Sequence, residues 1–339
     1  MTLDRLEVIE AVEVAAKATT SKGTLAVLGA VKFDGQRVSG YNLDYYASAP
    51  LVTDFQTAVG VKPFLQYLKS LTSTQVDIEV IEGNITVGFG DTKATFPTFD
   101  VADVPSFEIN PDTDRPIPFD SDRFRTIVAV CTPYVSLDQT RMVLNGIHVS
   151  QDDDGIVYAC ATDGRRLIRV PIGEVAEGFD AIIPIEYLRL IAKESITHIN
   201  VNDTSIGFTC KSGNFYAGKL INAVYPNVKQ VIPPDNGMRK VVLPEDIVTR
   251  LKRLEVAGKG VSVTLDITPE MCTITTQTGG IKLEDTFEVS SEITDTLIFN
   301  VSYLIGVVSA SNILLIKDSS SPIVVNYMGG KIVLMPMRN

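Results

Sequence analysis

The sequence predicts an α+β fold built from three copies of one repeat, each with two helices and about eight strands. The first observation is an aromatic-leucine pair that recurs at Phe64-Leu65, Tyr187-Leu188 and Tyr303-Leu304, at steps of 123 and 116 residues. The second is that the helix expected to open each repeat begins at steps of 117 and 122 residues. Because two independent markers share one period, we infer an internal repeat rather than a chance series of helices.

The first repeat contains sequence patterns of both helices and strands. Apolar residues recur every three or four positions over residues 5–18 and again over 62–71, which is typical of amphipathic helices. Short runs rich in β-branched and aromatic residues fill residues 25–52 and 76–96, separated by Asp-Gly and other turn signals. We therefore expect each repeat to place its two helices on one face of its sheets.

The same order of elements returns twice, each time after a stretch that is typical of a linker. Ile109–Pro118 combines prolines with acidic residues, and Ile232–Gly237 reads I-P-P-D-N-G. Further helices are expected at residues 121–133, 185–194, 244–257 and 301–311, with strands between them. The predicted domains are therefore residues 1–112, 113–236 and 237–339.

Composition indicates a globular protein with more than one core. The chain has 339 residues, of which 45% are hydrophobic and 21% are charged. Its net charge of −11 at pH 7 argues against a protein that coats nucleic acid with a generally basic surface. It leaves room for a local basic lining, since the five charged helical segments carry 11 Lys or Arg against 9 Asp or Glu.

The cysteines and the N-terminal segment indicate the compartment. Cys131, Cys160, Cys210 and Cys272 are widely spaced without a C-x-x-C pair, so we predict buried thiols in a reducing compartment, no metal site and no cofactor. The first 22 residues carry four acids instead of a basic start. No stretch approaches the roughly 20 apolar residues of a membrane helix. We therefore expect a cytoplasmic protein.

Two short stretches have ordinary structural explanations when each is taken alone. Ile332–Asn339 reads I-V-L-M-P-M-R-N, in which Pro336 would stop an edge strand. Ala161–Leu167 reads A-T-D-G-R-R-L, in which Asp163-Gly164 is a strong hairpin signal between alternating apolar residues.

Together with others, these stretches resemble motifs of one protein family. Ala161–Leu167 is similar to the A-T-D-G-x-R-L signature of the bacterial DNA polymerase III beta subunit, the DNA sliding clamp. Lys219-Leu220 with Tyr225–Pro233, then Phe299–Leu304, and finally Met335–Arg338 resemble later motifs of the same family, in the same order. Weaker matches in the first repeat extend the resemblance over the whole chain.

The resemblance implies a DNA-replication processivity factor. Two chains would form a homodimeric, head-to-tail ring around duplex DNA, with three clamp repeats per chain, each of two helices and two antiparallel sheets, and with the helices inside. A pocket between the second and third domains would receive short peptides of the replicative polymerase, the clamp loader and repair proteins. Carried over residue by residue, this partner-peptide pocket would use Leu144, Thr162, Gly164, Arg165, Arg166, Leu167, Pro226, Val231, Asn300, Tyr303, Val333, Met335, Pro336, Met337 and Arg338.

The chain departs from the family pattern at a few pocket positions. Arg165 stands where many members carry His, and Asn339 stands where an apolar residue is common. Met142 and Val143 replace aromatic residues of some members. These departures concern which peptides are preferred rather than whether a pocket exists.

A ring that holds DNA by topology needs only weak contacts with phosphates, which permit sliding without sequence choice. The predicted DNA-facing residues are Lys17, Lys22, Lys69, Arg123, Arg125, Arg141, Arg189, Lys193, Arg250, Lys252 and Arg253.

The ring contact is predicted from complementary edges. We expect the edge around Lys93 and Phe96 in the first repeat to meet the third repeat of a second chain near Leu254 and the acids Glu284 and Asp285. A basic, apolar edge would then face an acidic, apolar one.

Two other classes of protein compete with this interpretation. An enzyme with a cleft between β-rich repeats could hold a metal ion at Asp152–Asp154, although consecutive acids before a glycine are more often a solvated turn. The sequence contains no G-x-S-x-G, H-E-x-x-H or P-loop motif, so we expect no catalytic activity. The third class is a monomeric protein that keeps the peptide pocket without the ring.

Overall fold

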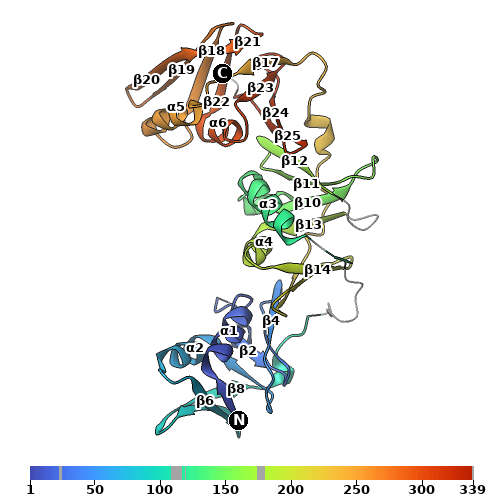
Figure 1. Cartoon of the computed structure of the whole chain (residues 1–339), viewed down its shortest axis with the longest axis vertical. Coiled ribbons are helices and arrows are strands. Elements are labelled where there is room, and N and C mark those ends of the chain that lie inside the picture. Colours follow the sequence, from blue (N-terminus) through green and yellow to red (C-terminus); the bar gives the residue numbers. More distant parts are fainter. Residues whose placement is uncertain (23–24, 108–116, 119, 174–179, 338–339) are drawn as a thin grey trace. The chain divides into compact units, whose positions relative to one another are not determined.

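The computed structural model describes residues 1–22, 25–107, 117–118, 120–173 and 180–337 (Figure 1). The chain divides into two compact units. We call residues 1–125 with 186–221 the N-terminal unit, and residues 126–185 with 222–339 the C-terminal unit. Most of the predicted linker Ile109–Pro118 and the predicted boundary at residue 112 lie outside the described residues, so the three-domain division stays a prediction.

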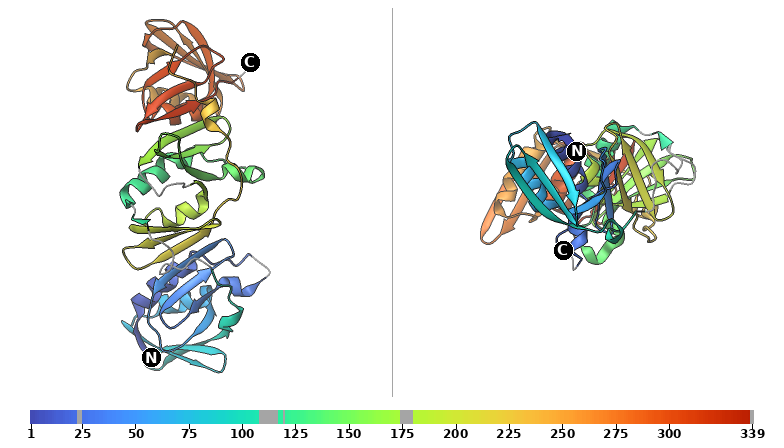
Figure 2. Two further views of the ribbon diagram at one scale, coloured as in Figure 1. Left: turned by 90° about the vertical axis from the view of Figure 1, so that its right-hand side faces the viewer. Right: turned by 90° about the horizontal axis from the view of Figure 1, so that it is seen from below.

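In the N-terminal unit, the described residues form one antiparallel sheet in the order β1-β6-β7-β8-β5-β2-β3-β4-β16-β15-β14-β9 (Figure 1). Its strands are β1 (Thr2–Asp4), β2 (Ala30–Phe33), β3 (Arg37–Tyr41), β4 (Tyr45–Pro50), β5 (Thr57–Gly60), β6 (Gln75–Ile81), β7 (Asn84–Phe89), β8 (Thr92–Phe99), β9 (Ile117–Pro118), β14 (Ile196–Val201), β15 (Ser205–Cys210) and β16 (Phe215–Lys219). Helices α1 (Arg5–Ala16) and α2 (Val61–Ser70) contact each other and pack on strands of this sheet (Figure 2).

Helix α1 shows which residues allow a helix to form and pack against this sheet. The Asp4 side chain accepts hydrogen bonds from the backbone N–H groups of Leu6 and Glu7, which caps the first turn. The apolar face of the helix is buried against β3 and β4. Gly40 on β3 permits this close approach, because a Cβ there would lie 2.2 Å from the carbonyl oxygen of Ala15.

Strands β4 and β16 join segments of the sheet that are far apart in the sequence. Their register pairs Ser48 with Phe215 and Tyr45 with Gly218. The ring of Tyr187 on α4 (Ile185–Ile191) stacks on Tyr45, with centroids 5.6 Å apart, and a Cβ at Gly218 would lie 2.9 Å from that ring. The sheet therefore continues from residues of the predicted first repeat into residues of the predicted second.

The C-terminal unit contains two antiparallel sheets among its described residues. The larger runs β13-β10-β11-β12-β25-β24-β23-β17-β21, and the smaller runs β20-β19-β18-β22. Their strands are β10 (Gly146–Gln151), β11 (Val157–Thr162), β12 (Arg166–Gly173), β13 (Asp180–Pro184), β17 (Arg239–Val242), β18 (Ser262–Ile267), β19 (Met271–Thr278), β20 (Ile281–Glu288), β21 (Ser290–Ser291), β22 (Asp295–Asn300), β23 (Ile313–Ile316), β24 (Ile323–Tyr327) and β25 (Gly330–Leu334). Helices α5 (Ile247–Leu254) and α6 (Val301–Val308) contact each other, and α3 (Ser121–Cys131) leads into this unit.

The predicted helices are confirmed, with shifts at their ends. The largest shift is in the segment predicted at 244–257, where α5 begins at Ile247 and residues 255–257 form a separate 3-10 turn. The predicted strand in the tail is β25, but the expectation that it lies at a sheet edge is wrong. It pairs with β24 on one side and with β12 on the other, because a hairpin from far earlier in the chain covers its second side.

The predicted buried thiols are found, since Cys131, Cys160, Cys210 and Cys272 are free and buried. Burial raises the pKa of Cys160 and of Cys272 to about 12. Within the described residues, no helix combines the length and the apolar character needed to cross a membrane.

Candidate functional site

The two stretches singled out in the sequence lie side by side in the C-terminal unit. The register of β12 and β25 pairs Arg166 with Leu334 and Leu167 with Val333. Beyond the last strand pair, the backbone N–H of Met335 donates to the carbonyl oxygen of Arg165 at 2.9 Å. The tail is therefore held along the A-T-D-G-R-R-L hairpin by main-chain hydrogen bonds.

The turn of that hairpin is held by its own side chains. The hydroxyl of Thr162 donates to the carbonyl oxygen of Arg166 at 2.8 Å and accepts the N–H of Gly164 at 3.0 Å. The carboxylate of Asp163 accepts the N–H groups of Arg165 and Arg166 at 2.9 and 3.0 Å. Gly164 has a φ of +85°, a conformation that L side chains rarely adopt. These bonds explain locally why the motif needs Thr, Asp and Gly in this order.

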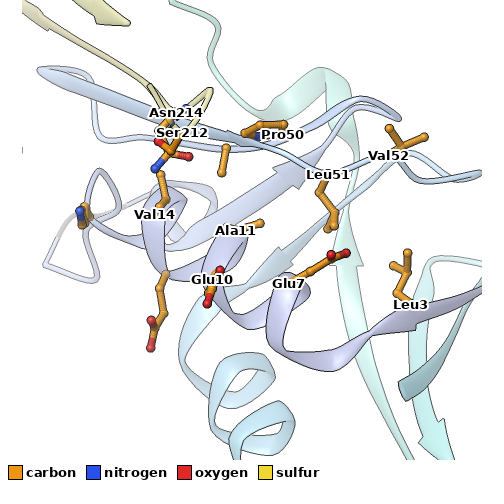
Figure 3. A pocket seen from close by; sticks show the side chains of 13 residues that line it. Leu3, Glu7, Glu10, Ala11, Val14, Pro50, Leu51, Val52, Ser212 and Asn214 are labelled. Atoms are coloured by element: carbon orange, nitrogen blue, oxygen red, sulfur yellow. Dashed lines mark hydrogen bonds between the residues drawn. The ribbon is translucent and has the colours of Figure 1, made fainter. Parts of the chain in front are cut away.

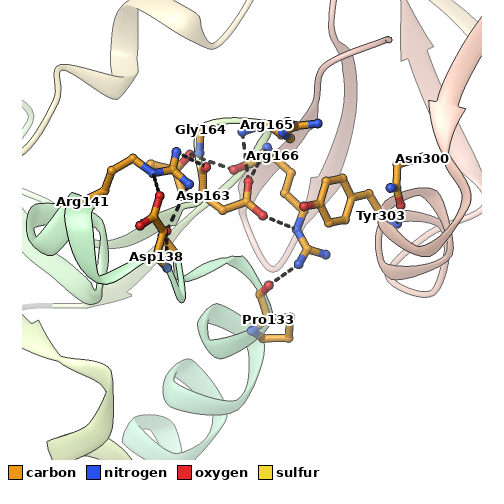
Figure 4. A network of polar contacts seen from close by, with 11 residues as sticks. Pro133, Asp138, Arg141, Asp163, Gly164, Arg165, Arg166, Asn300 and Tyr303 are labelled. Atoms are coloured by element: carbon orange, nitrogen blue, oxygen red, sulfur yellow. Dashed lines mark hydrogen bonds and ion pairs between the residues drawn. The ribbon is translucent and has the colours of Figure 1, made fainter. Parts of the chain in front are cut away.

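Arg166 is fixed on several sides (Figure 4). Its Nε donates to Asp163 at 3.0 Å, and its Nη2 donates to the carbonyl oxygen of Pro133. The guanidinium lies 4.2 Å from the ring centroid of Tyr303 and 5.2 Å from that of Tyr134. Burial raises the pKa of Tyr134 to about 12, although the charge of Arg166 acts in the opposite direction. Arg166 is thus a cation with a preset orientation.

Arg141 supports the same turn from the segment before β10. Its Nη1 donates to the carbonyl oxygen of Asp163 at 2.9 Å, and its Nε pairs with Asp138 at 3.2 Å (Figure 4). The hydrogen bonds of Thr140 and the ion pair with Arg141 lower the pKa of Asp138. Arg141 was predicted to face DNA, and the structure places it instead against the hairpin.

Beside the hairpin lies a cavity of about 270 Å³. Its lining residues are Leu144, Thr162, Gly164, Arg165, Arg166, Leu167, Pro226, Asn227, Val228, Val231, Val333 and Met335. The lining is predominantly apolar, and its charged side chains are two arginines. A concave, apolar surface with a few fixed polar groups is the usual form of a ligand pocket.

Most of the predicted pocket residues line this cavity, and two lining residues were missed. Asn227 and Val228 stand between Pro226 and Val231, which were both predicted. The short 3-10 turn Val228–Val231 turns Val228 inward, where it is 9% exposed. The predicted residues Pro226 and Val231 lie on either side of the two missed residues in the sequence and could have indicated them.

Other predicted pocket residues do not line the cavity. The side chain of Asn300 caps α6 by accepting the N–H of Tyr303 at 3.1 Å, and it donates to the carbonyl oxygen of Gly260 at 2.9 Å. Tyr303 contacts Arg166, as described above. The N–H of Met337 donates to the carbonyl oxygen of Ile298 at 2.7 Å. Pro336 lies between the lining and Met337, and Arg338 lies outside the described residues.

The wall formed by residues 226–231 is anchored by an ionic network. Lys229 pairs with Asp152, and Asp152 also accepts a hydrogen bond from Arg169. The guanidinium of Arg169 lies 3.3 Å from the ring centroid of Tyr158. Hydrogen bonds with Asp152, the largest contribution, and with Asp153 raise the pKa of Lys229. The network ties the wall to β11 and β12.

The acids Asp152–Asp154, which the rival enzyme interpretation would use to hold a metal ion, are engaged in other contacts. Asp152 is paired with two cations, and Asp154 accepts the N–H of Ile156 at 2.9 Å, as expected for a turn. In the described part of the chain, no three His, Cys, Asp or Glu side chains gather in a way that could hold a metal ion.

Some of the predicted DNA-facing cations are paired within the N-terminal unit. The Nζ of Lys17 lies 2.9 Å from the carboxylate of Glu194 and 3.0 Å from the hydroxyl of Tyr216. Burial, together with the hydrogen bond and charge of Glu194, raises the pKa of Tyr216. Lys69 lies 2.5 Å from Glu13. These two lysines are therefore only partly available to an anion.

The other predicted cations fall into two groups. Members of the first group form ion pairs. Arg125 pairs with Asp122. Arg250 pairs with Asp246 and with Asp285, and both of these Arg250 distances are 2.9 Å. The second group is exposed and forms no ion pair with the described residues: Lys22, Arg123, Arg189, Lys193, Lys252 and Arg253. Their role in contacting DNA stays a prediction.

The residues predicted to close a ring lie at two strand edges, with one correction. Phe96 on β8 packs against Phe64 and Tyr67, with ring centroids 5.6 and 5.7 Å apart, and Lys93 on the same strand is exposed. Leu254 is only 2% exposed, so it belongs to the core around α5 and offers no surface to a second chain.

Both edges are open in the described residues. Residues 92–97 of β8 pair with β7 on one side, while β5 reaches only Thr98 and Phe99. Strand β20, which carries Glu284 and Asp285, pairs with β19 alone. Glu284 lies 2.9 Å from Lys282, and Asp285 holds Arg250. An unpaired strand edge is a template for pairing with another chain.

Comparison with known proteins identifies this fold. No family model matches the chain. The beta sliding clamp of Rickettsia bellii is 24% identical over 323 residues, which cover 86% of this chain and 84% of that protein. The crystal structure of the DNA polymerase III subunit beta from Pseudomonas aeruginosa superposes with a TM-score of 0.89 at 20% identity and covers all of both chains.

A second solved structure is similarly close. It is a sliding clamp from Bartonella birtlesii bound to griselimycin, with a TM-score of 0.88, 19% identity, and coverage of 100% of this chain and 99% of that chain. The predicted α+β fold of helices and antiparallel sheets, and the predicted resemblance to sliding clamps, are confirmed.

Proposed function

We propose that this chain, which has the fold and the sequence motifs of the bacterial beta sliding clamps, is itself a DNA sliding clamp. Two copies close head-to-tail around duplex DNA and tether the replicative polymerase, the clamp loader and other partners by short peptides. The observation that carries the proposal is the meeting of the A-T-D-G-R-R-L hairpin and the M-P-M tail at one apolar cavity. It occurs in a chain that matches solved clamps over its whole length.

The cavity suits an apolar anchor of an extended peptide. Leu144, Val228 and Val333 give it apolar walls, while the exposed Arg165 and nearby backbone groups can hold a peptide chain by hydrogen bonds. Burying one Leu-sized side chain contributes about 1.5–3 kcal/mol. One or two such anchors with a few hydrogen bonds give dissociation constants on the order of micromolar, which lets partners exchange.

The DNA contacts in this proposal are the exposed, unpaired cations on and near the helices. A phosphate contact from such a side chain is electrostatic and independent of sequence. Lys252 and Arg253 at the end of α5 are examples. The acidic remainder of the chain discourages binding of DNA elsewhere, because the net charge is −11.

The open edges of β8 and β20 support the head-to-tail contact. Pairing β8 of one chain with β20 of another would satisfy both rows of backbone groups and set Lys93 opposite an acidic strand. The contact is heterologous, and the ring we propose uses it twice, once at each junction between the two copies. We expect Phe96→Asp to give monomers in light scattering, and Lys93→Glu to weaken the dimer without disturbing the packing of Phe96. An intact dimer in both variants would contradict this placement.

Tethering explains how such a ring acts without chemistry of its own. A polymerase bound to the ring returns to its template by an intramolecular step, at an effective concentration of order millimolar for a short flexible link. Dissociation then becomes a brief interruption, and synthesis becomes processive. No catalytic residue is needed for this function.

The deciding experiment combines mass in solution with retention on DNA. We expect a dimer by light scattering that, once loaded by a clamp loader, stays on circular DNA through gel filtration and leaves when the circle is cut. A monomer that binds partner peptides but is never retained on circles would favour the monomeric peptide-binding alternative.

A further inference from the structure

A second groove lies in the N-terminal unit, and the proposed function leaves it without a role (Figure 3). It has a volume of about 730 Å³ and runs beside helix α1. Its lining residues are Leu3, Glu7, Glu10, Ala11, Glu13, Val14, Lys17, Ala49, Pro50, Leu51, Val52, Ser212 and Asn214. Figure 3 shows Leu3, Leu51 and Val52 toward one end and Ser212 and Asn214 toward the other.

The walls of the groove are held in place by the fold. Arg37 donates to the hydroxyl of Ser48 at 3.0 Å and to the carbonyl oxygen of Gly213 at 2.8 Å, which ties the turn at 211–214 to β4. The N–H of Leu51 donates to the carbonyl oxygen of Gln36 at 2.9 Å. Helix α1 is fixed by its buried face. The groove is therefore formed before any ligand arrives.

The floor of the groove is apolar, and part of it is exposed. Val52 is 65% exposed, while Leu51 and Ala49 beneath it are buried. An aliphatic side chain placed between Leu3, Leu51 and Val52 would remove apolar surface from water.

The rim of the groove carries negative charge that the chain does not neutralise. Glu7 and Glu10 are exposed and form no ion pair with the described residues, whereas Glu13 pairs with Lys69 and Lys17 pairs with Glu194. Figure 3 shows the Glu7 side chain directed toward the space between Leu3 and Leu51.

Helix stability does not account for both acids. Glu7 lies in the first turn of α1, where the helix dipole favours an acid, but Glu10 lies beyond it. Like charges one turn apart destabilise a helix. The two exposed carboxylates are therefore available to a cationic group from outside the described residues.

We propose that this groove docks a basic segment of a partner protein, with one aliphatic side chain on Leu3, Leu51 and Val52 and Lys or Arg side chains on Glu7 and Glu10. Charge complementarity selects this occupant. DNA and anionic lipid are repelled by the rim. In the proposed ring a second copy of this chain would use the edges of β8 and β20, which leaves this groove to another protein. The inference does not depend on the peptide pocket.

The test uses a fluorescent peptide with one leucine between two lysines, and a matched peptide with glutamates in place of the lysines. Anisotropy should detect binding of the lysine peptide alone. We expect Glu7→Gln/Glu10→Gln to weaken that binding at least about tenfold. Glu79→Gln/Asp103→Asn removes the same charge from exposed positions of the same unit and should leave it unchanged. Carbodiimide should cross-link the peptide lysines to Glu7 or Glu10.

Further variants separate the groove from the peptide pocket and from a simple acidic patch. Removal of residues 335–339 should leave lysine-peptide binding intact, whereas Val52→Ser should weaken it. The proposal is overturned if the glutamate peptide binds equally well, if Glu7→Gln/Glu10→Gln has no effect, if Val52→Ser has no effect, or if the lysine peptide does not bind.

Discussion

The pocket and the helix surfaces use basic side chains in opposite ways. At the pocket, Arg166 is 15% exposed and is held by Asp163, by a carbonyl oxygen and by two aromatic rings. At the end of α5, Lys252 and Arg253 are exposed and form no ion pair with the described residues. Under the proposed function, the pocket selects a peptide and benefits from side chains ordered in advance, whereas the helix surfaces slide on DNA and benefit from charges that remain mobile.

The largest effect expected at the pocket comes from removing Met335–Asn339. The deletion takes away Met335, an apolar lining residue, and its hydrogen bond to Arg165, but leaves β25 paired on both sides. We expect peptide affinity to fall by more than about a hundredfold while the dimer is retained. Calorimetric titration with a partner peptide and light scattering measure the two quantities. Retained affinity would show that the tail only completes the sheet.

The two neighbouring arginines of the hairpin provide a matched pair. Arg166→Ala removes a fixed cation that contacts Tyr303 and Asp163, so we expect peptide affinity to fall about tenfold and the free energy of unfolding to fall by about 1–3 kcal/mol. Arg165→Ala removes an exposed side chain and should weaken the peptide only about threefold. Titration and thermal unfolding of both variants measure the difference. Equal losses would mean that preset orientation is not what matters at this pocket.

Local patterns in the sequence predicted the elements of the fold but not all of their neighbours. The helices follow from apolar spacing, and the hairpin follows from Asp163-Gly164. The tail strand was misplaced at an edge, because its pairing with β12 joins residues that are far apart in the sequence. Leu254 was taken for a surface residue because a helical pattern does not state which apolar positions a second helix covers.

The sequence predicted the candidate site about as completely as it predicted the fold. Motif residues such as Thr162, Leu167 and Met335 line the cavity as expected. Arg141 was assigned to DNA, whereas the structure holds its guanidinium against the carbonyl oxygen of Asp163. Asn300 matched a motif but serves as a helix cap. Residue type and order indicate a site, but long-range hydrogen bonds decide which atoms face it.

The helix surfaces are tested by comparing free with paired cations. Lys252→Gln/Arg253→Gln removes two exposed charges and should reduce the salt dependence of DNA retention by about two counterions. Lys17→Gln/Lys69→Gln removes two charges that Glu194 and Glu13 already neutralise, so its effect should be smaller. Retention of loaded protein on circular DNA, followed over a salt series, measures both. If retention depended on salt concentration equally in the two double variants, the distinction between unpaired and ion-paired cations would be contradicted.

The smallest effect is expected at Asp152, which does not line the cavity. Asp152 holds Lys229 and Arg169, and so keeps the 226–231 wall beside the cavity. Asp152→Asn keeps the shape of the side chain but removes its charge, so the wall should loosen and peptide affinity should fall about two- to threefold. Raising the salt concentration should reduce the difference in peptide affinity between Asp152→Asn and the parent protein, because salt screens the same ion pairs in the parent. Asp153→Asn changes a fully exposed carboxylate that lies 3.4 Å from the same Lys229, so its effect should be smaller than that of Asp152→Asn. A larger loss in Asp152→Asn would show that the ordering of the pocket extends to an ionic network outside its lining.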